Sequence, residues 1–319
     1  MIEHIINFCK KWTLPVAITV GTAVYFIFAS IPSFDACGEW FVGAFGMALP
    51  AALFMVLFVT FCRIDFRKMR LHWWHFWALV TQLVMACGIV ATIHFMHLTG
   101  NELVLMECML TCIIGPCAAA SAVVTGKLGG DVESMTTFTF LSNFATAVLI
   151  PTLFPLVNPS AGISFLSAFM LILYKVLIVL VLPMGCAWVV KHYLHRLHQW
   201  MTTKPDLSFY LWACVLAMVT GTTMRNIVHA STTWQMLSVI AALSLVLCFV
   251  QFALGRSIGN AFGHRIDCGQ ALGQKNTAFA IWISATYLHP LASVAPGCYI
   301  LWQNIVNSFE LWLQAREKA

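Results

Sequence analysis

Long apolar segments recur along the chain and are separated by short polar connections. Ten of them hold about the 20 apolar residues that a helix needs to cross the hydrocarbon core of a bilayer. They are residues 12–31, 40–62, 73–97, 103–128, 133–157, 162–190, 207–224, 232–254, 265–288 and 291–313. The pattern predicts an all-α integral membrane protein with ten transmembrane helices.

Two of these segments are interrupted at their centres. The fourth reads LTCIIGPCAAASAVVTGKLGGD, and the proline of its Gly115-Pro116 pair lacks an N–H donor and clashes with the preceding turn. The ninth reads DCGQALGQKNTAFAIWIS, with the polar triplet Gln274-Lys275-Asn276 at its centre. Each is the fourth member of a set of five, and the two sets have opposite orientations. This pattern is typical of inverted-repeat transporters with crossing broken helices 4 and 9, although two ordinary kinks are the alternative.

Composition and charge agree with a membrane location. Hydrophobic residues make up 61% of the 319 residues and charged residues 9%, whereas soluble domains carry about 25% charged residues. If the N-terminus is cytoplasmic, fourteen loop Lys and Arg residues lie on that side and only Arg225 on the other. This asymmetry predicts a multi-pass protein of the cell (inner) membrane with both termini in the cytoplasm. It also accounts for the net charge of +5 without a nucleic-acid partner.

The remaining reactive side chains do not form an enzyme signature. The twelve cysteines contain no C-x-x-C pair, and single cysteines in apolar helices are usually packing residues, so we expect no metal and no cofactor. Neither G-x-S-x-G nor H-E-x-x-H occurs, so we expect no catalytic residues. The run KHYLHRLHQ places His192, His195 and His198 on an amphipathic turn, which we interpret as an interfacial face.

The interrupted segments resemble motifs of the bile acid:sodium symporter family. GPCAAASAVVTGKLGGD is similar to the fourth-helix motif P-G-G-x-x-S-N, followed by G-D, with Pro116 and Ser121 in register. LGQKNTAFA resembles the ninth-helix motif E-V-G-M-Q-N-S-G-L-A, with Gly273 and Asn276 in register. ALVTQLVMACGIV, which contains Gln82, and LHPLASVAPGCYILWQNIVNS, which contains Asn304, resemble the third and tenth helices.

The resemblance implies a single transporter domain over residues 1–319, built from inverted repeats at about 12–157 and 162–313. Helices 1, 2, 6 and 7 would form a panel, and helices 3–5 and 8–10 a core. The broken helices would cross in the core, flank two sodium sites and face the substrate cavity.

The sequence departs from this family where sodium should bind. Three expected oxygen ligands are replaced by apolar side chains, at Ala122, Met135 and Ala271. The side chains that remain are Gln82, Ser121 and Thr139. The glutamine of the ninth-helix motif is Lys275. Sodium needs several hard oxygen ligands, so the sequence favours transport without sodium.

A lysine in mid-span costs about 2.5–3.5 kcal/mol on insertion scales, so we expect Lys275 to be functional. We hypothesise that its ammonium replaces the bound cation beside unwound carbonyls, with Gln82 as its hydrogen-bond partner. The ammonium would be either a permanent cation or the carrier of a coupling proton. Helix N-termini at the crossing add positive potential, which predicts a small organic anion as substrate, a carboxylate or an amphipathic acid. Its predicted ligands are Pro116, Ser121, Asn276 and Asn304.

Several alternatives stay open at this level. A sodium-coupled bile-acid-type symporter and a non-transporting membrane sensor of the same fold are the other functions that fit the sequence. Lys175, in the middle of the sixth segment, is equally compatible with a cavity-facing and a packing role. Glu107 would either pair with a lysine or gate at the outer mouth, or lie at headgroup level.

Overall fold

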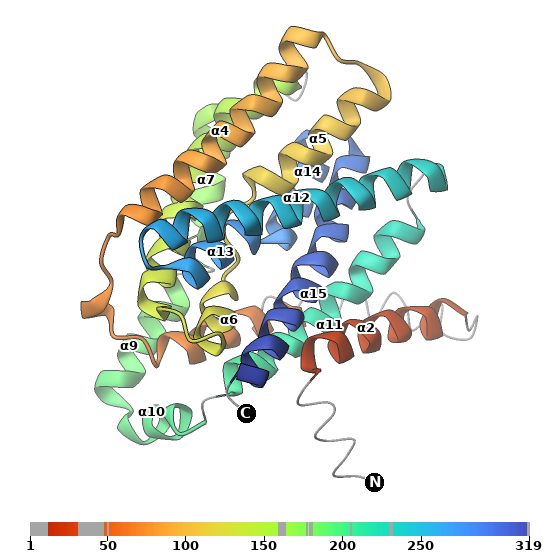
Figure 1. Cartoon of the computed structure of the whole chain (residues 1–319). Helices are drawn as coiled ribbons and strands as arrows, with labels where there is room; N and C mark the ends of the chain where they lie inside the picture. The colour runs from red at the N-terminus through yellow and green to blue at the C-terminus, as the bar shows by residue number, and fades with distance from the viewer. Residues whose placement is uncertain are drawn as a thin grey trace. The chain divides into compact units, whose positions relative to one another are not determined.

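The computed structural model describes residues 12–30, 48–49, 51–158, 164–176, 178, 181–204, 206–229 and 232–317. The chain divides into two compact units. Unit 1 comprises Met1–Ile64, Val181–His229 and Asn304–Ala319, and unit 2 comprises Asp65–Leu180 and Ala230–Gln303. Every regular secondary-structure element within the described residues is a helix (Figure 1).

The described helices follow the predicted apolar segments. In chain order they are α2 (Thr13–Ser30), a helix over Ala51–Phe61, α4 (Trp73–Met96), α5 (Gly100–Ile114), α6 (Ser121–Lys127), α7 (Val132–Val157), α8 (Phe165–Val176), α9 (Leu182–Tyr193), α10 (His195–Thr202), α11 (Leu207–Val228), α12 (Trp234–Ala261), α13 (Arg265–Gly273), α14 (Thr277–Tyr287) and α15 (Val294–Glu317). Short 3-10 helices, η2 (Phe66–Lys68) and η5 (Pro290–Ser293), precede α4 and α15.

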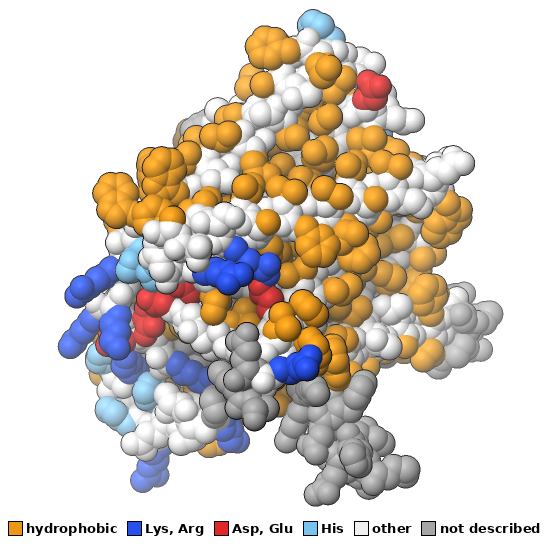
Figure 2. Space-filling model, in the orientation of Figure 1, with side chains coloured by type: hydrophobic (Ala, Val, Ile, Leu, Met, Phe, Trp, Pro, Cys, Tyr) orange, Lys and Arg blue, Asp and Glu red, His pale blue; other side chains and the backbone are white. Residues whose placement is uncertain are grey.

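Four of the described helices are long and apolar enough to cross a membrane unaided. They are Trp73–Met96, Val132–Val157, Leu207–Arg225 and Trp234–Ala261. Large apolar side chains are exposed along α4 and α12, among them Val84, Val246 and Phe249 (Figure 2). Soluble monomers rarely expose apolar surface so continuously. The protein is therefore a multi-pass membrane protein, whereas the number of ten spans and their inverted symmetry remain predictions.

Two predicted spans are described only in part. Of residues 40–62, positions 40–47 and 50 lie outside the described residues. The sixth segment contains α8 in unit 2 and α9 in unit 1, and the side chain of Lys175 lies outside the described residues. The tenth segment is also shared, because α15 passes from unit 2 to unit 1 after Gln303.

Within each unit, helices approach closely where one of them carries glycine. In unit 1, a Cβ at Gly21 of α2 would lie 2.2 Å from the carbonyl oxygen of Ala217 in α11. In unit 2, a Cβ at Gly255 of α12 would lie 2.3 Å from the carbonyl oxygen of Cys268 in α13, and the two helices run side by side (Figure 1). Small residues let membrane helices pack backbone to backbone, which compensates for the weak hydrophobic driving force in lipid.

Both predicted helix interruptions are present. Helix α5 ends at Ile114, immediately before Gly115-Pro116, and α6 begins only at Ser121. Helix α13 ends at Gly273, and α14 begins at Thr277. The side-chain oxygen of Asn276 accepts a hydrogen bond from the backbone N–H of Phe279 at 3.2 Å and caps the second half-helix.

The glycine contact between α12 and α13 gives a stability prediction. Gly255→Ala should lower the free energy of unfolding by about 1–3 kcal/mol, because the new methyl group would overlap the Cys268 carbonyl. Gly88→Ala on α4 is the matched control, since a Cβ there meets nothing within 4 Å and alanine favours a helix. Apparent melting temperatures in detergent measure both, and equal stability of the two variants would contradict this packing.

Candidate functional site

The two interrupted segments cross in contact with each other. The N–H of Ala118 donates to the carbonyl of Gln274 at 2.9 Å, and the N–H of Asn276 donates to the carbonyl of Pro116 at 2.8 Å. Between these bonds, Cys117 and Lys275 form an isolated antiparallel bridge. Extended backbone inside a membrane protein must find such internal partners, because lipid offers none. The crossing therefore satisfies the groups that both helices leave unpaired.

Side chains from neighbouring helices donate hydrogen bonds to the C-terminal carbonyls of α5. The amide nitrogen of Gln82 donates to the carbonyls of Ile114 at 3.1 Å and Gly115 at 3.2 Å. The hydroxyl of Thr146 also donates to Ile114, at 3.1 Å, and Gln251 donates to Cys112 at 3.2 Å. The last carbonyls of a helix lack helical partners and carry its negative dipole end. Helices α4, α7 and α12 thus each supply a hydrogen-bond donor to the C-terminal end of α5.

Lys275 completes this arrangement. Its ammonium nitrogen donates to the carbonyl of Ile113 at 3.0 Å, and the residue is only 2% exposed. The amide side chain of Gln303 holds its backbone, accepting from the N–H at 2.8 Å and donating to the carbonyl at 3.3 Å. No carboxylate among the described residues forms an ion pair with Lys275. A cation is thus fixed at the negative end of α5.

Gln82 and Lys275 serve the same helix end but do not bond to each other in the described structure, contrary to expectation. Both hydrogens of the Gln82 amide are used by the two successive carbonyls of α5. The ammonium of Lys275 reaches the carbonyl one residue earlier. The sequence indicated both residues, but their relative placement depends on the packing of α4 against α5.

Ser121 and Thr139 are brought together around the thiol of Cys117. The thiol donates to the hydroxyl of Ser121 at 3.2 Å, and the hydroxyl of Thr139 contacts the sulfur at 3.8 Å. Ser121 also donates to the carbonyl of Gln274 at 3.4 Å, and Ser142 accepts from the N–H of Cys117 at 2.9 Å. The sequence reasoning missed Ser142, along with Gln251 and Gln303, because single polar residues in apolar helices carry no spacing signal.

The positions that lost oxygen ligands form an apolar cluster. Ala122, Met135 and Ala271 are at most 3% exposed and pack in one group with Trp74 and Phe138. The group offers methyl, thioether and aromatic surface where the resemblance implied oxygen atoms. These residues do not fit a sodium ion, which needs a shell of hard oxygen ligands.

The other predicted substrate ligands have different surroundings. Pro116 is buried, and its carbonyl is used in the crossing. Asn276 is partly buried and caps α14. Asn304 is fully buried and belongs to unit 1, whereas the crossing belongs to unit 2. Glu107 is 3% exposed, and its carboxylate accepts from the N–H of His289 at 3.0 Å. It therefore holds the turn before η5.

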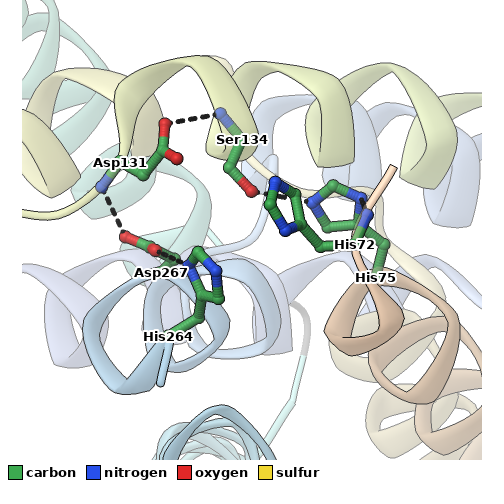
Figure 3. A network of polar contacts seen from close by, with 6 residues as sticks. All are labelled: His72, His75, Asp131, Ser134, His264 and Asp267. Carbon is green, nitrogen blue, oxygen red and sulfur yellow. Dashed lines mark hydrogen bonds and ion pairs between the residues drawn. The ribbon is translucent and has the colours of Figure 1, made fainter. Parts of the chain in front are cut away.

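A second polar network connects the start of α13 with the turn between α6 and α7, at the ends of the broken helices that lie away from the crossing (Figure 3). Asp267, in the first turn of α13, accepts from the N–H of Asp131 at 2.8 Å and lies 2.6 Å from Nδ1 of His264. Asp131 caps α7 by accepting from the N–H of Ser134 at 2.9 Å. His75 of α4 extends this polar network through a 3.1 Å contact between its Nε2 and the Ser134 hydroxyl.

This network explains why Gly130 precedes Asp131. A Cβ on Gly130 would lie 2.2 Å from the carboxylate oxygen of Asp267 and 2.7 Å from the Thr125 methyl group. The turn after α6 can therefore approach α13 only with glycine at this position. The network fixes both half-helices at the end away from the crossing, and it is a positioning element.

Comparison with known proteins agrees with the motif resemblance. The family model described as the sodium bile acid symporter family matches residues 50–230, which is more than half of the chain. No curated protein matches the sequence. The matched region contains the first interrupted segment and Gln82, Ser121 and Thr139. On this evidence the chain belongs to the sodium bile acid symporter family of membrane transporters.

Proposed function

We propose that the protein is a secondary transporter of a small organic anion that works without sodium, with the ammonium of Lys275 in place of the bound cation. The observation that carries this proposal is the 3.0 Å bond between the Lys275 ammonium and the Ile113 carbonyl. A sodium ion at a helix C-terminus would be held by the same kind of oxygen. A lysine fixed there supplies the charge permanently.

The sign of the substrate follows from the charges at the crossing. Helix α5 directs its negative end at Lys275, while α14 begins immediately after the crossing and directs its positive end towards it. The Lys275 charge has no paired carboxylate among the described residues. In a medium of low dielectric constant, a positive charge without a paired carboxylate favours the binding of an anion such as a carboxylate. We assign its contacts to Asn276, Ser121 and the backbone around Pro116.

The division of the chain follows the predicted panel and core in part. Unit 2 contains α4 to α7 and α12 to α14, which cover the third to fifth, eighth and ninth segments. Unit 1 contains α2 and α11, from the first and seventh segments. The match to a panel and a core is incomplete, because α8 of the sixth segment lies in unit 2 and α15 passes from unit 2 to unit 1 after Gln303. We propose one transporter domain made of these two parts, in the inner membrane with cytoplasmic termini.

The apolar cluster supports independence from sodium. Neutral, buried side chains at Ala122, Met135 and Ala271 leave no acceptor there for a hard cation. Without sodium, transport is either uncoupled or driven by protonation of Lys275 itself. In the second case the ammonium would release its proton in one half of the cycle and regain it in the other.

Flux through proteoliposomes tests the proposal directly. Radiolabelled small carboxylates should enter by a saturable process whose rate is the same in sodium and in choline buffers. Binding without flux would identify a non-transporting sensor, and flux that requires millimolar sodium would identify a sodium-coupled symporter. Either result would overturn the function proposed here.

Removing the Lys275 charge should weaken anion binding. Lys275→Met removes the positive charge that would attract the anion, and an interaction with a charged group of about 1.5–3 kcal/mol corresponds to a roughly 10- to 100-fold weaker affinity. Lys275→Arg keeps the charge but should fit the buried site poorly. Lys68→Met, at an exposed position of η2, is the control. Normal transport and an unchanged pH profile in Lys275→Met would show that this lysine has no transport role.

Restoring the family's oxygen ligands should restore sodium dependence. The triple variant Ala122→Asn, Ala271→Glu and Lys275→Gln places polar groups in the apolar cluster and removes the competing cation. Its melting temperature should therefore rise with sodium concentration, because bound sodium would compensate for the buried carboxylate. Lys275→Gln alone should not respond, since Ala271 still provides no charge. A sodium response of the wild-type protein at millimolar concentrations would contradict this account.

A further inference from the structure

Helix α10 is a short amphipathic helix placed where the chain leaves the sixth apolar segment. It begins at His195, two residues after α9 ends at Tyr193. The residue between them, Leu194, has φ −115° and ψ 59°, which interrupts the helical path. The axis of α10 consequently turns away from that of α9 (Figure 1). The asymmetry of the loop charges predicts that this connection lies on the cytoplasmic side of the membrane.

One face of α10 is fixed by contacts within unit 1. Nε2 of His198 lies 2.9 Å from the carbonyl of Cys62. The guanidinium of Arg63 donates to the carbonyl of Met201 at 3.0 Å and also to that of Lys204. Met201 is 4% exposed. The contacts satisfy carbonyls at the C-terminal end of the helix and set which of its faces is turned outwards.

The outward face carries an aromatic ring between two cations. Arg196, Trp200 and Lys204 follow at intervals of four residues, so they lie on one side of the helix and its C-terminal extension. Trp200 is 49% exposed, and the ammonium of Lys204 lies 4.2 Å from its ring centroid. Leu197 is exposed beside them. This combination presents an amphipathic ring and fixed positive charge together.

Basic residues outnumber acidic ones around α10, and the nearest acidic residue in the sequence is Asp206. Residues 191–204 contain Lys191, Arg196, Lys204 and three histidines but no Asp or Glu. Figure 2 shows Lys, Arg and His side chains gathered over α9 and α10. Tryptophan is enriched at the membrane interface, and basic amphipathic helices bind there through apolar burial and attraction to anionic lipids.

We propose that α10 binds anionic phospholipid headgroups, with Arg196 and Lys204 on the phosphates and Trp200 and Leu197 among the upper acyl chains. The inference is independent of the transported substrate, because all of these residues belong to unit 1 and follow the sixth segment, whereas the crossing belongs to unit 2. A basic residue near an anionic surface strengthens binding about fivefold.

The test uses the full-length protein in a neutral detergent. Its apparent melting temperature is followed while short-chain phosphatidylglycerol, short-chain phosphatidylcholine or inorganic phosphate is added, since a ligand of the folded state raises this temperature. Phosphatidylglycerol should stabilise the protein at lower concentration than the other two. In Arg196→Gln/Lys204→Gln its half-saturating concentration should rise about 25-fold, from two fivefold contributions.

Two further variants keep the result decisive. Arg67→Gln/Lys68→Gln removes two exposed cations from η2 and should leave the phosphatidylglycerol response within about twofold of wild type. If the α10 double variant does not fold, Lys204→Gln alone should show about a fivefold change, because Arg63 bonds only to the backbone of that residue. Equal responses to both lipids, an equal response to free phosphate, or an unchanged response in the α10 variants would overturn the proposal.

Discussion

The structure of unit 2 depends on one constraint: backbone that leaves a helix inside an apolar medium must be paired within the protein. Pro116 removes a donor and ends α5, and the polar triplet at Gln274 to Asn276 ends α13. Neither break could be tolerated alone. Together they supply each other's partners through two backbone bonds of 2.8 and 2.9 Å. The remaining carbonyls of α5 then recruit Gln82, Thr146, Gln251 and Lys275.

The choice of lysine changes the chemistry of this crossing. A lysine ammonium and a metal cation both compensate helix carbonyls, but an ammonium is covalently attached and cannot be exchanged with the solution. At the three positions where the resemblance implied oxygen ligands, Ala122, Met135 and Ala271 pack in one apolar cluster, which stabilises unit 2 through buried surface.

The periphery of unit 2 shows how the crossing is held in place. Asp267 joins the start of α13 to the turn before α7, and Gly130 leaves the room for this contact. Gly255 and Gly259 allow α12 to lie directly on α13. These contacts hold α13 against α12 and against the turn before α7.

The sequence by itself determined the membrane location, the helical segments and both interruptions, because apolar length, proline and a polar triplet act locally along the chain. It also indicated Lys275 and Gln82, since a charge in mid-span is costly wherever the helix lies. Only the tertiary structure decided that both serve the end of α5 and that Ser121 and Thr139 meet at Cys117. It also decided that Glu107 holds the turn at His289. Such contacts join residues far apart in the chain, so they depend on how helices pack against each other, which local patterns do not encode.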